Sequence, residues 1–114
     1  MPSSDKPTRK LAAIMFTDIA GFTQSMSKSE SVTLDLLEQK RSIIKPLLNK
    51  HDGTFVKEIG DGTLSYFDSA INASTCAVKL QENTYDTDIN IRVGIHIGDI
   101  VFKGDDVFGD GVNV

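Results

Sequence analysis

The chain of 114 residues has one cysteine, no tryptophan and no long apolar segment. We expect Cys76 to be a buried reduced thiol, because it shares a helical stripe with Ala73 and Leu80. The longest apolar run, Leu11 to Phe16, is much shorter than the ~20 residues that a membrane-spanning helix needs. The polar opening, residues 1–9, has no apolar signal-peptide core, and we interpret it as a flexible leader. These absences favour a cytoplasmic protein without a membrane segment.

The chain also lacks an excess of basic residues. It has 12 lysines and arginines against 16 aspartates and glutamates, whereas a nucleic-acid-binding face is usually basic. We therefore expect no nucleic-acid partner. The acidic residues gather late in the chain, which leaves carboxylates available for cations. With 39% hydrophobic and 25% charged residues, the composition is that of one ordinary globular domain.

The spacing of apolar residues predicts six elements in the order strand, helix, strand, strand, helix, strand. Pro46 is expected to kink the first helix, and Asp68 and Ser69 offer side chains that can cap the second. The predicted ranges are a strand over 10–19, a helix over 29–50, hairpin strands over 54–59 and 63–67, a helix after residue 69, and a strand over 90–101.

This order of elements is that of the ferredoxin-like unit, an α+β sandwich of the form βαββαβ. Its antiparallel sheet carries two helices on one face. Right-handed crossovers place the third strand between the first and the second, antiparallel to both. The start of the third strand then lies against the end of the first. We therefore expect Asp61, in the hairpin, and Asp18, near the end of the first strand, at one edge of the sheet.

The hairpin sequence VKEIGDGTLSYF (56–67) leaves two roles open for Asp61, because Asp-Gly is a strong turn signal. Two carboxylates that share one mouth repel each other unless they are protonated or bridged by a cation, and their oxygens suit Mg²⁺ or Mn²⁺. Beside them, residues 19–23 begin a short helix whose free N–H groups could cradle a phosphate. In the structural alternative, Asp18 caps that helix and Asp61 only makes a turn.

Four segments resemble the signature segments of class III nucleotidyl cyclase catalytic domains, in the family's order and with compatible spacing. They are FTDIAGFT (16–23), KEIGDG (57–62), RVGIHIGD (92–99) and DVFGDGVNV (106–114). Four ordered matches are far more specific than any one of them. We interpret residues 10–114 as a cyclase catalytic domain. Because the last segment stops where a further element begins, we expect this domain to be incomplete at its C-terminus.

The resemblance implies a role for each matching position. Asp18 and Asp61 correspond to the two metal-binding aspartates, and Ile19 corresponds to the residue whose backbone carbonyl also binds metal. In the family, two ions, Mg²⁺ or Mn²⁺, activate the ribose 3′-hydroxyl and hold the triphosphate. The hydroxyl then attacks the α-phosphorus and pyrophosphate leaves. The phosphates would lie over four residues: Ala20, Gly21, Phe22 and Thr23.

Lys57 matches the base-recognising lysine of adenylyl cyclases, and Asp106 matches its acidic partner. Hydrogen-bond chemistry supports this assignment, because adenine offers an acceptor at N1 for the ammonium and a donor at N6 for the carboxylate. Guanylyl members typically carry a glutamate and a smaller residue at these places. Taken alone, Lys57 is more simply an exposed strand lysine. The implied activity is conversion of ATP to 3′,5′-cyclic AMP and pyrophosphate, in cyclic-nucleotide signal transduction.

Asn113 matches the asparagine that helps to orient the ribose near the transition state. Its companion arginine, four residues on, would fall at position 117, and the loss of such a group commonly costs orders of magnitude in rate. We therefore expect residues 1–114 alone to be weakly active at best. His96 is interpreted as a packing or solvent-facing residue and Arg92 as a surface or interface charge.

The resemblance also implies a homodimer with composite sites. A nucleotide held by Asp18 and Asp61 of one subunit would be read by Lys57 and Asp106 of the other. Three alternatives remain: a cyclase-like nucleotide-binding or regulatory module with weak or no turnover, a guanylyl or diguanylate cyclase, and a ferredoxin-like interaction domain without a ligand. The diguanylate reading ranks low because 60–62 lacks the adjoining Glu-Phe of GGDEF-type enzymes.

Overall fold

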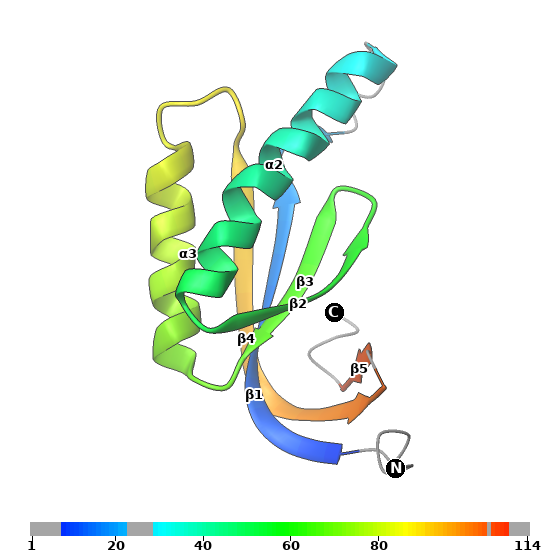
Figure 1. Ribbon diagram of the computed structural model, residues 1–114, viewed down its shortest axis with the longest axis vertical. Helices are drawn as coiled ribbons and strands as arrows, with labels where there is room; N and C mark the ends of the chain where they lie inside the picture. Colours follow the sequence, from blue (N-terminus) through cyan, green and yellow to red (C-terminus); the bar gives the residue numbers. More distant parts are fainter. Residues whose placement is uncertain (1–7, 23–28, 105, 110–114) are drawn as a thin grey trace.

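The computed structural model describes residues 8–22, 29–104 and 106–109. These residues form one antiparallel sheet in the strand order β2-β3-β1-β4-β5, with both helices on one face (Figure 1). The α+β, ferredoxin-like βαββαβ arrangement is therefore confirmed, including β3 between β1 and β2. The elements are β1 (Thr8–Ile19), α2 (Glu30–Lys50), β2 (Gly53–Ile59), β3 (Gly62–Phe67), α3 (Ala70–Thr84), β4 (Ile91–Lys103) and β5 (Asp106–Phe108).

The six predicted elements are all present, and two details differ from expectation: the start of β1 and an additional short strand. Thr8 and Arg9, which we assigned to the leader, are part of β1 and pair with β4. As the predicted range of 29–50 implied, α2 continues through Pro46 to Lys50. The short strand β5 was not predicted, because a strand of three residues shows no period of two.

The main hydrophobic core lies between the sheet and the two helices. Each helix is preceded by a serine N-cap whose side chain accepts a backbone N–H, Ser29 for α2 and Ser69 for α3. Cys76 is 1% exposed within this core, as predicted, and burial raises the pKa of its thiol. The buried members are Ala13, Met15, Ile19, Ile44, Leu47, Leu48, Phe67, Ala73, Cys76, Leu80, Ile89 and Ile91.

A second, smaller core lies on the opposite face of the sheet. There β1 and β4 bend together and β5 follows the end of β4 (Figure 1), so that Val107 packs with residues of β1, β3 and β4. Because the middle of β1 is covered on both faces, residues 12–15 are all buried, which explains the unbroken apolar run. The buried members of this core are Ala12, Ile14, Leu64, Ile100 and Val107.

The helix-side face of β4 is less covered than its alternating pattern predicted. Ile91 is buried, but Ile95 is 37% exposed and Ile97 is 54% exposed. The described helices cover only the first part of this strand.

Over residues 8–22, 29–104 and 106–109, no helix is long and apolar enough to cross a membrane.

Candidate functional site

The end of β1 lies beside the turn between β2 and β3. Ile59 pairs with Gly62, so Gly60 and Asp61 are the two central residues of this turn. Gly60 has a φ of 60°, a conformation that favours glycine, as the first central position of a type II′ turn requires. The predicted hairpin is therefore present, but its turn is one residue shorter than the expected 60–62, because Gly62 already belongs to β3.

Asp61 is joined directly to the end of β1. Its Oδ2 accepts a hydrogen bond from the backbone N–H of Ile19 at 2.8 Å. Because the N–H and C=O of one strand residue point to the same side, the carbonyl of Ile19 also faces this turn. The prediction that the hairpin and the end of β1 meet at one edge of the sheet is confirmed.

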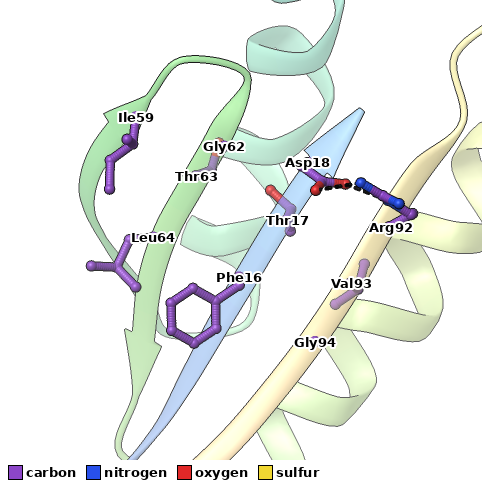
Figure 2. A pocket seen from close by; sticks show the side chains of 10 residues that line it. All are labelled: Phe16, Thr17, Asp18, Ile59, Gly62, Thr63, Leu64, Arg92, Val93 and Gly94. Atoms are coloured by element: carbon purple, nitrogen blue, oxygen red, sulfur yellow. Dashed lines mark hydrogen bonds and ion pairs between the residues drawn. The ribbon is translucent and has the colours of Figure 1, made fainter. Parts of the chain in front are cut away.

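Asp18 points to the face of the sheet that lies away from the helices. Its cross-strand partner on β4 is Arg92. Arg92 donates from Nε to Oδ1 at 2.7 Å and from Nη2 to Oδ2 at 2.8 Å (Figure 2). These hydrogen bonds lower the pKa of the Asp18 carboxyl and raise the pKa of the guanidinium. Arg92, which we interpreted as a surface or interface charge, is exposed but is paired with a candidate metal ligand.

A hollow of about 470 Å³ opens on this same face, with Asp18 and Arg92 at one end (Figure 2). Phe16 and Leu64 provide apolar walls from β1 and β3. On β4, a Cβ atom at Gly94 would meet nothing within 4 Å, so the strand is open at that place. The full lining consists of Phe16, Thr17, Asp18, Ile59, Gly62, Thr63, Leu64, Arg92, Val93 and Gly94. The hollow has one charged end and an apolar body, as pockets for small molecules commonly do.

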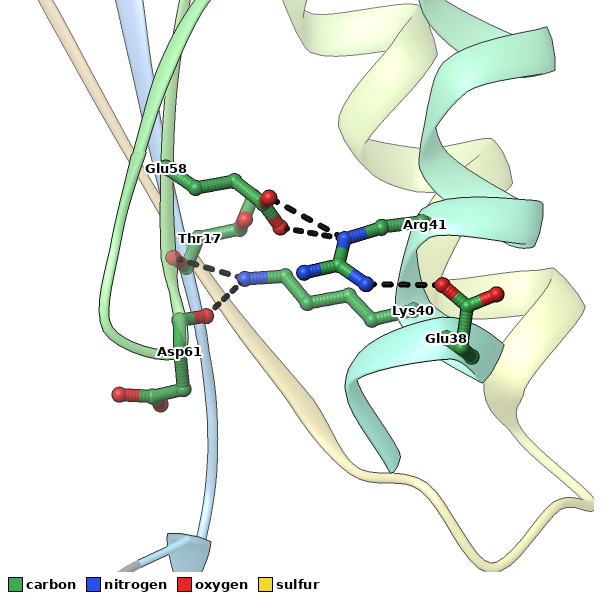
Figure 3. Close-up of polar contacts among 6 residues, drawn as sticks. All are labelled: Thr17, Glu38, Lys40, Arg41, Glu58 and Asp61. Atoms are coloured by element: carbon green, nitrogen blue, oxygen red, sulfur yellow. Dashed lines mark hydrogen bonds and ion pairs between the residues drawn. The ribbon is translucent and has the colours of Figure 1, made fainter. Parts of the chain in front are cut away.

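Lys40 of α2 approaches the same edge from the helix side. Its side chain is 1% exposed, and Nζ donates to the backbone carbonyl of Thr17 at 3.3 Å and to that of Asp61 (Figure 3). Burial lowers the pKa of Lys40 to about 8, against the opposing effects of Asp61 and Asp18. The sequence analysis missed this residue. The available signal was its spacing, because Lys40 falls on the apolar stripe that includes Leu36 and Ile44.

Lys57 and Asp106 form an ion pair between the two edge strands. Lys57 Nζ lies 3.0 Å from Asp106 Oδ1 and 3.2 Å from Oδ2. A bulge between Phe55 and Lys57 places Lys57 opposite Leu64, and so on the face away from the helices. Asp106 also accepts the N–H of Val107, and this bond, followed by the bond from Lys57, lowers the pKa of its carboxyl.

The expected phosphate cradle is only partly available. We expected the N–H of Ala20 to be free. It donates instead to the carbonyl of Asn90 at 2.8 Å. Gly21 has a φ of 75°, and Phe22 packs against the main core. Thr23 and Asn113 lie outside the described residues. Any phosphate at this place would have to use N–H groups that follow Ala20.

Comparison with known proteins decides the family. The model of the adenylate and guanylate cyclase catalytic domain matches residues 5–114. The chain belongs to this cyclase family.

Two bacterial relatives of this cyclase domain carry adenylate cyclase names. "Putative adenylate cyclase 3" of Rhizobium meliloti (strain 1021) is 40% identical over 115 residues, a match that covers 93% of this chain and 20% of the relative. "Adenylate cyclase" of Streptomyces coelicolor is 33% identical over 105 residues, covering 90% and 28%. The cyclase domain thus spans less than a third of the length of either relative.

A solved structure shares the fold of the cyclase domain. The crystal structure of the "Adenylate/Guanylate Cyclase/Hydrolase" from Silicibacter pomeroyi is 38% identical, with a TM-score of 0.83 over 95% of this chain and 68% of that one. The described strands and helices are therefore those of a nucleotidyl cyclase catalytic domain.

Class III cyclases generally use divalent metal ions, and the end of β1 and the β2–β3 turn carry oxygen donors of the kind that bind such ions. Within the described part of the chain, no group of three or more His, Cys, Asp or Glu side chains comes together. The available oxygen donors are the carboxylates of Asp18 and Asp61 and the carbonyl of Ile19. Mg²⁺ commonly takes one or two carboxylates together with water and substrate phosphates, so this set suits it.

Proposed function

We propose that this cyclase domain is an adenylyl cyclase that converts ATP to 3′,5′-cyclic AMP and pyrophosphate. The observation that carries the choice of base is the ion pair of Lys57 and Asp106. The pair presents an ammonium donor and a carboxylate acceptor on one face of the sheet, and adenine has the matching acceptor at N1 and donor at N6. Guanine presents the opposite pattern at these positions, so the same pair would leave its groups mismatched.

The metal ligands in this proposal are Asp18, Asp61 and the carbonyl of Ile19. Bound there, two Mg²⁺ or Mn²⁺ ions would stabilise charge on the phosphates and make the ribose 3′-hydroxyl a better nucleophile. The N–H of Ile19 fixes the orientation of the Asp61 carboxylate through their 2.8 Å hydrogen bond. The triphosphate would lie at Ala20, Gly21, Phe22 and Thr23, and Asn113 would orient the ribose.

We further propose that two copies form composite sites across the face that the helices leave open. Asp18 and the pair of Lys57 and Asp106 both lie on this face, which supports an arrangement in which each copy supplies one part of a site. Mixing the variants Asp61→Ala and Lys57→Ala should then restore one complete site per heterodimer. Failure of this rescue, with both variants folded, would rule out shared sites.

A second candidate is a nucleotide-binding module with weak or no turnover. It is favoured by one specific observation, that the carboxylate of Asp18 is already paired with Arg92. In that case the protein would bind ATP with Mn²⁺ but release no pyrophosphate. An assay of pyrophosphate release therefore separates this candidate from the first.

The deciding experiment incubates the full-length protein with ATP or GTP and with Mn²⁺ or Mg²⁺, and measures cyclic AMP, cyclic GMP and pyrophosphate. We expect cyclic AMP from ATP, and no activity when the metal is removed by a chelator. Preferential formation of cyclic GMP would overturn the assignment of the base.

A further inference from the structure

Lys40 contacts both segments that carry the candidate metal ligands. One of its hydrogen bonds goes to the carbonyl of Thr17, directly before Asp18, and the other goes to the carbonyl of Asp61 itself (Figure 3). The lysine belongs to α2, so its side chain connects the helix layer to the edge of the site. A single ammonium thus joins the end of β1 to the turn between β2 and β3.

The surroundings of Lys40 indicate that its charge serves more than packing. It occupies a position on the apolar stripe of α2, and it is 1% exposed. An apolar side chain of similar size would fill this place without the desolvation cost of a buried cation. In the described part of the chain, no carboxylate forms a salt bridge with Lys40. Its hydrogen-bond partners are main-chain carbonyls, and both lie at the edge of the site.

The neighbouring residue provides a contrast. Arg41 also joins α2 to the hairpin, through a two-oxygen contact with Glu58 at 3.0 and 3.1 Å, and it contacts Glu38 as well (Figure 3). Arg41 is partly exposed, and in the described structure it makes no hydrogen bond to the backbone of Thr17 or Asp61. It therefore tethers the same two elements without contacting the candidate ligand segments.

We propose that Lys40 is a positioning residue that sets the spacing between the carboxylates of Asp18 and Asp61. By holding the carbonyls of Thr17 and Asp61 to one ammonium, it fixes the two segments relative to each other before an ion arrives. Its positive charge also reduces the repulsion between the two carboxylates in the absence of metal. This inference rests on the proposed function, in which these carboxylates bind a divalent ion.

The test is a Mn²⁺ titration of the full-length protein in the presence of a non-cyclisable ATP analogue, with free Mn²⁺ measured by electron paramagnetic resonance. Lys40→Met keeps the length of the side chain and removes the charge and both hydrogen bonds. We expect its Mn²⁺ affinity to fall about 10- to 100-fold, as is typical when a group that orients metal ligands is lost. Arg41→Met, the matched control, should stay within about twofold of the wild type, because it leaves the ligand segments in place.

Unfolding curves in urea separate positioning from a general loss of stability. We expect the unfolding midpoint of Lys40→Met to change little, because removal of a desolvated charge offsets the loss of its two hydrogen bonds. If that variant does not fold, Lys40→Gln is titrated instead, since its shorter amide cannot reach both carbonyls, and the same loss of affinity is expected.

The outcomes are distinct. If the wild-type protein binds no Mn²⁺ with the nucleotide analogue, the proposed function fails. If the wild type binds Mn²⁺ and the folded Lys40 variant binds it equally well, the positioning role is wrong. Tighter binding by the variant would also overturn the proposal, because it would show that the main effect of the ammonium is to repel the metal ion.

Discussion

The two candidate metal ligands are anchored from opposite faces of the sheet and in opposite ways. The turn that carries Asp61 is held from the helix side by Lys40, which is 1% exposed. Asp18 is held from the open side by Arg92, whose side chain is 69% exposed. A buried cation that binds main-chain carbonyls has no solvent with which to replace these partners, whereas an exposed ion pair contributes little and exchanges its partners readily. We infer that the hydrogen bonds of Lys40 stay in place when a metal ion binds, whereas Arg92 is a counter-ion that the metal ion can replace at Asp18.

The largest effect is expected when the candidate ligands themselves are replaced. This tests whether Asp18 and Asp61, which are held in different ways, belong to one site. Asp18→Asn and Asp61→Asn should each lower cyclic AMP formation by at least about 100-fold, since each loses a charge that stabilises the transferring phosphate. Initial rates with saturating Mn²⁺ and ATP measure this. Asp35→Asn, on an exposed part of α2, is the control. If only one carboxylate variant were inactive, the two residues would not share a site.

A smaller effect concerns the third cation, Lys57, which also lies on the open face. The double variant Lys57→Glu with Asp106→Ser reverses the hydrogen-bonding pattern offered to the base. The ratio of ATP to GTP efficiency, compared as kcat/KM, should fall by at least about tenfold, a size typical of a changed polar contact. An unchanged ratio in a folded, active double variant would show that this pair does not read the base.

Removal of Arg92 sharpens the contrast with Lys40. Arg92→Met frees the Asp18 carboxylate and removes a positive charge beside it. The affinity for Mn²⁺ should therefore rise about two- to fivefold. This is the opposite direction from the effect expected for Lys40→Met. The measurement is the same Mn²⁺ titration. Weaker binding in the Arg92 variant would show that the guanidinium positions Asp18 rather than standing in for the ion.

The smallest expected effect is on stability in acid. The folded-state pKa of Asp18 lies below its usual 3.8, with the hydrogen bond from Arg92 as the main cause. Its contribution is therefore fully present above pH 3.8 and is lost as the pH falls through the lowered pKa. Because Arg92 is exposed and Asp18 is partly exposed, solvent screens the pair, and we expect this contribution to the unfolding free energy to be small. The difference in unfolding free energy between wild type and Arg92→Met should shrink from pH 6 to pH 3, and a constant difference would contradict this.

The order and topology of the main elements could be predicted from the sequence, because the helices and β4 have a clear period and β1 is an apolar run that ends at a turn signal. The meeting of the β2–β3 turn with the end of β1 followed from that topology. The pairing of Asp18 with Arg92 could not be predicted, since it depends on the register of β1 against β4. The role of Lys40 was missed because a lysine within a helix is usually solvent-exposed. The bulge before Lys57, which sets the face of that side chain, also leaves no periodic signal.

The most direct test of the metal site is anomalous diffraction from a crystal of the protein with Mn²⁺ and a non-cyclisable ATP analogue. We predict Mn²⁺ between the carboxylates of Asp18 and Asp61, with Arg92 released from Asp18 and Lys40 still bound to the carbonyls of Thr17 and Asp61. Mn²⁺ bound elsewhere, with the ion pair of Asp18 and Arg92 intact, would contradict this account.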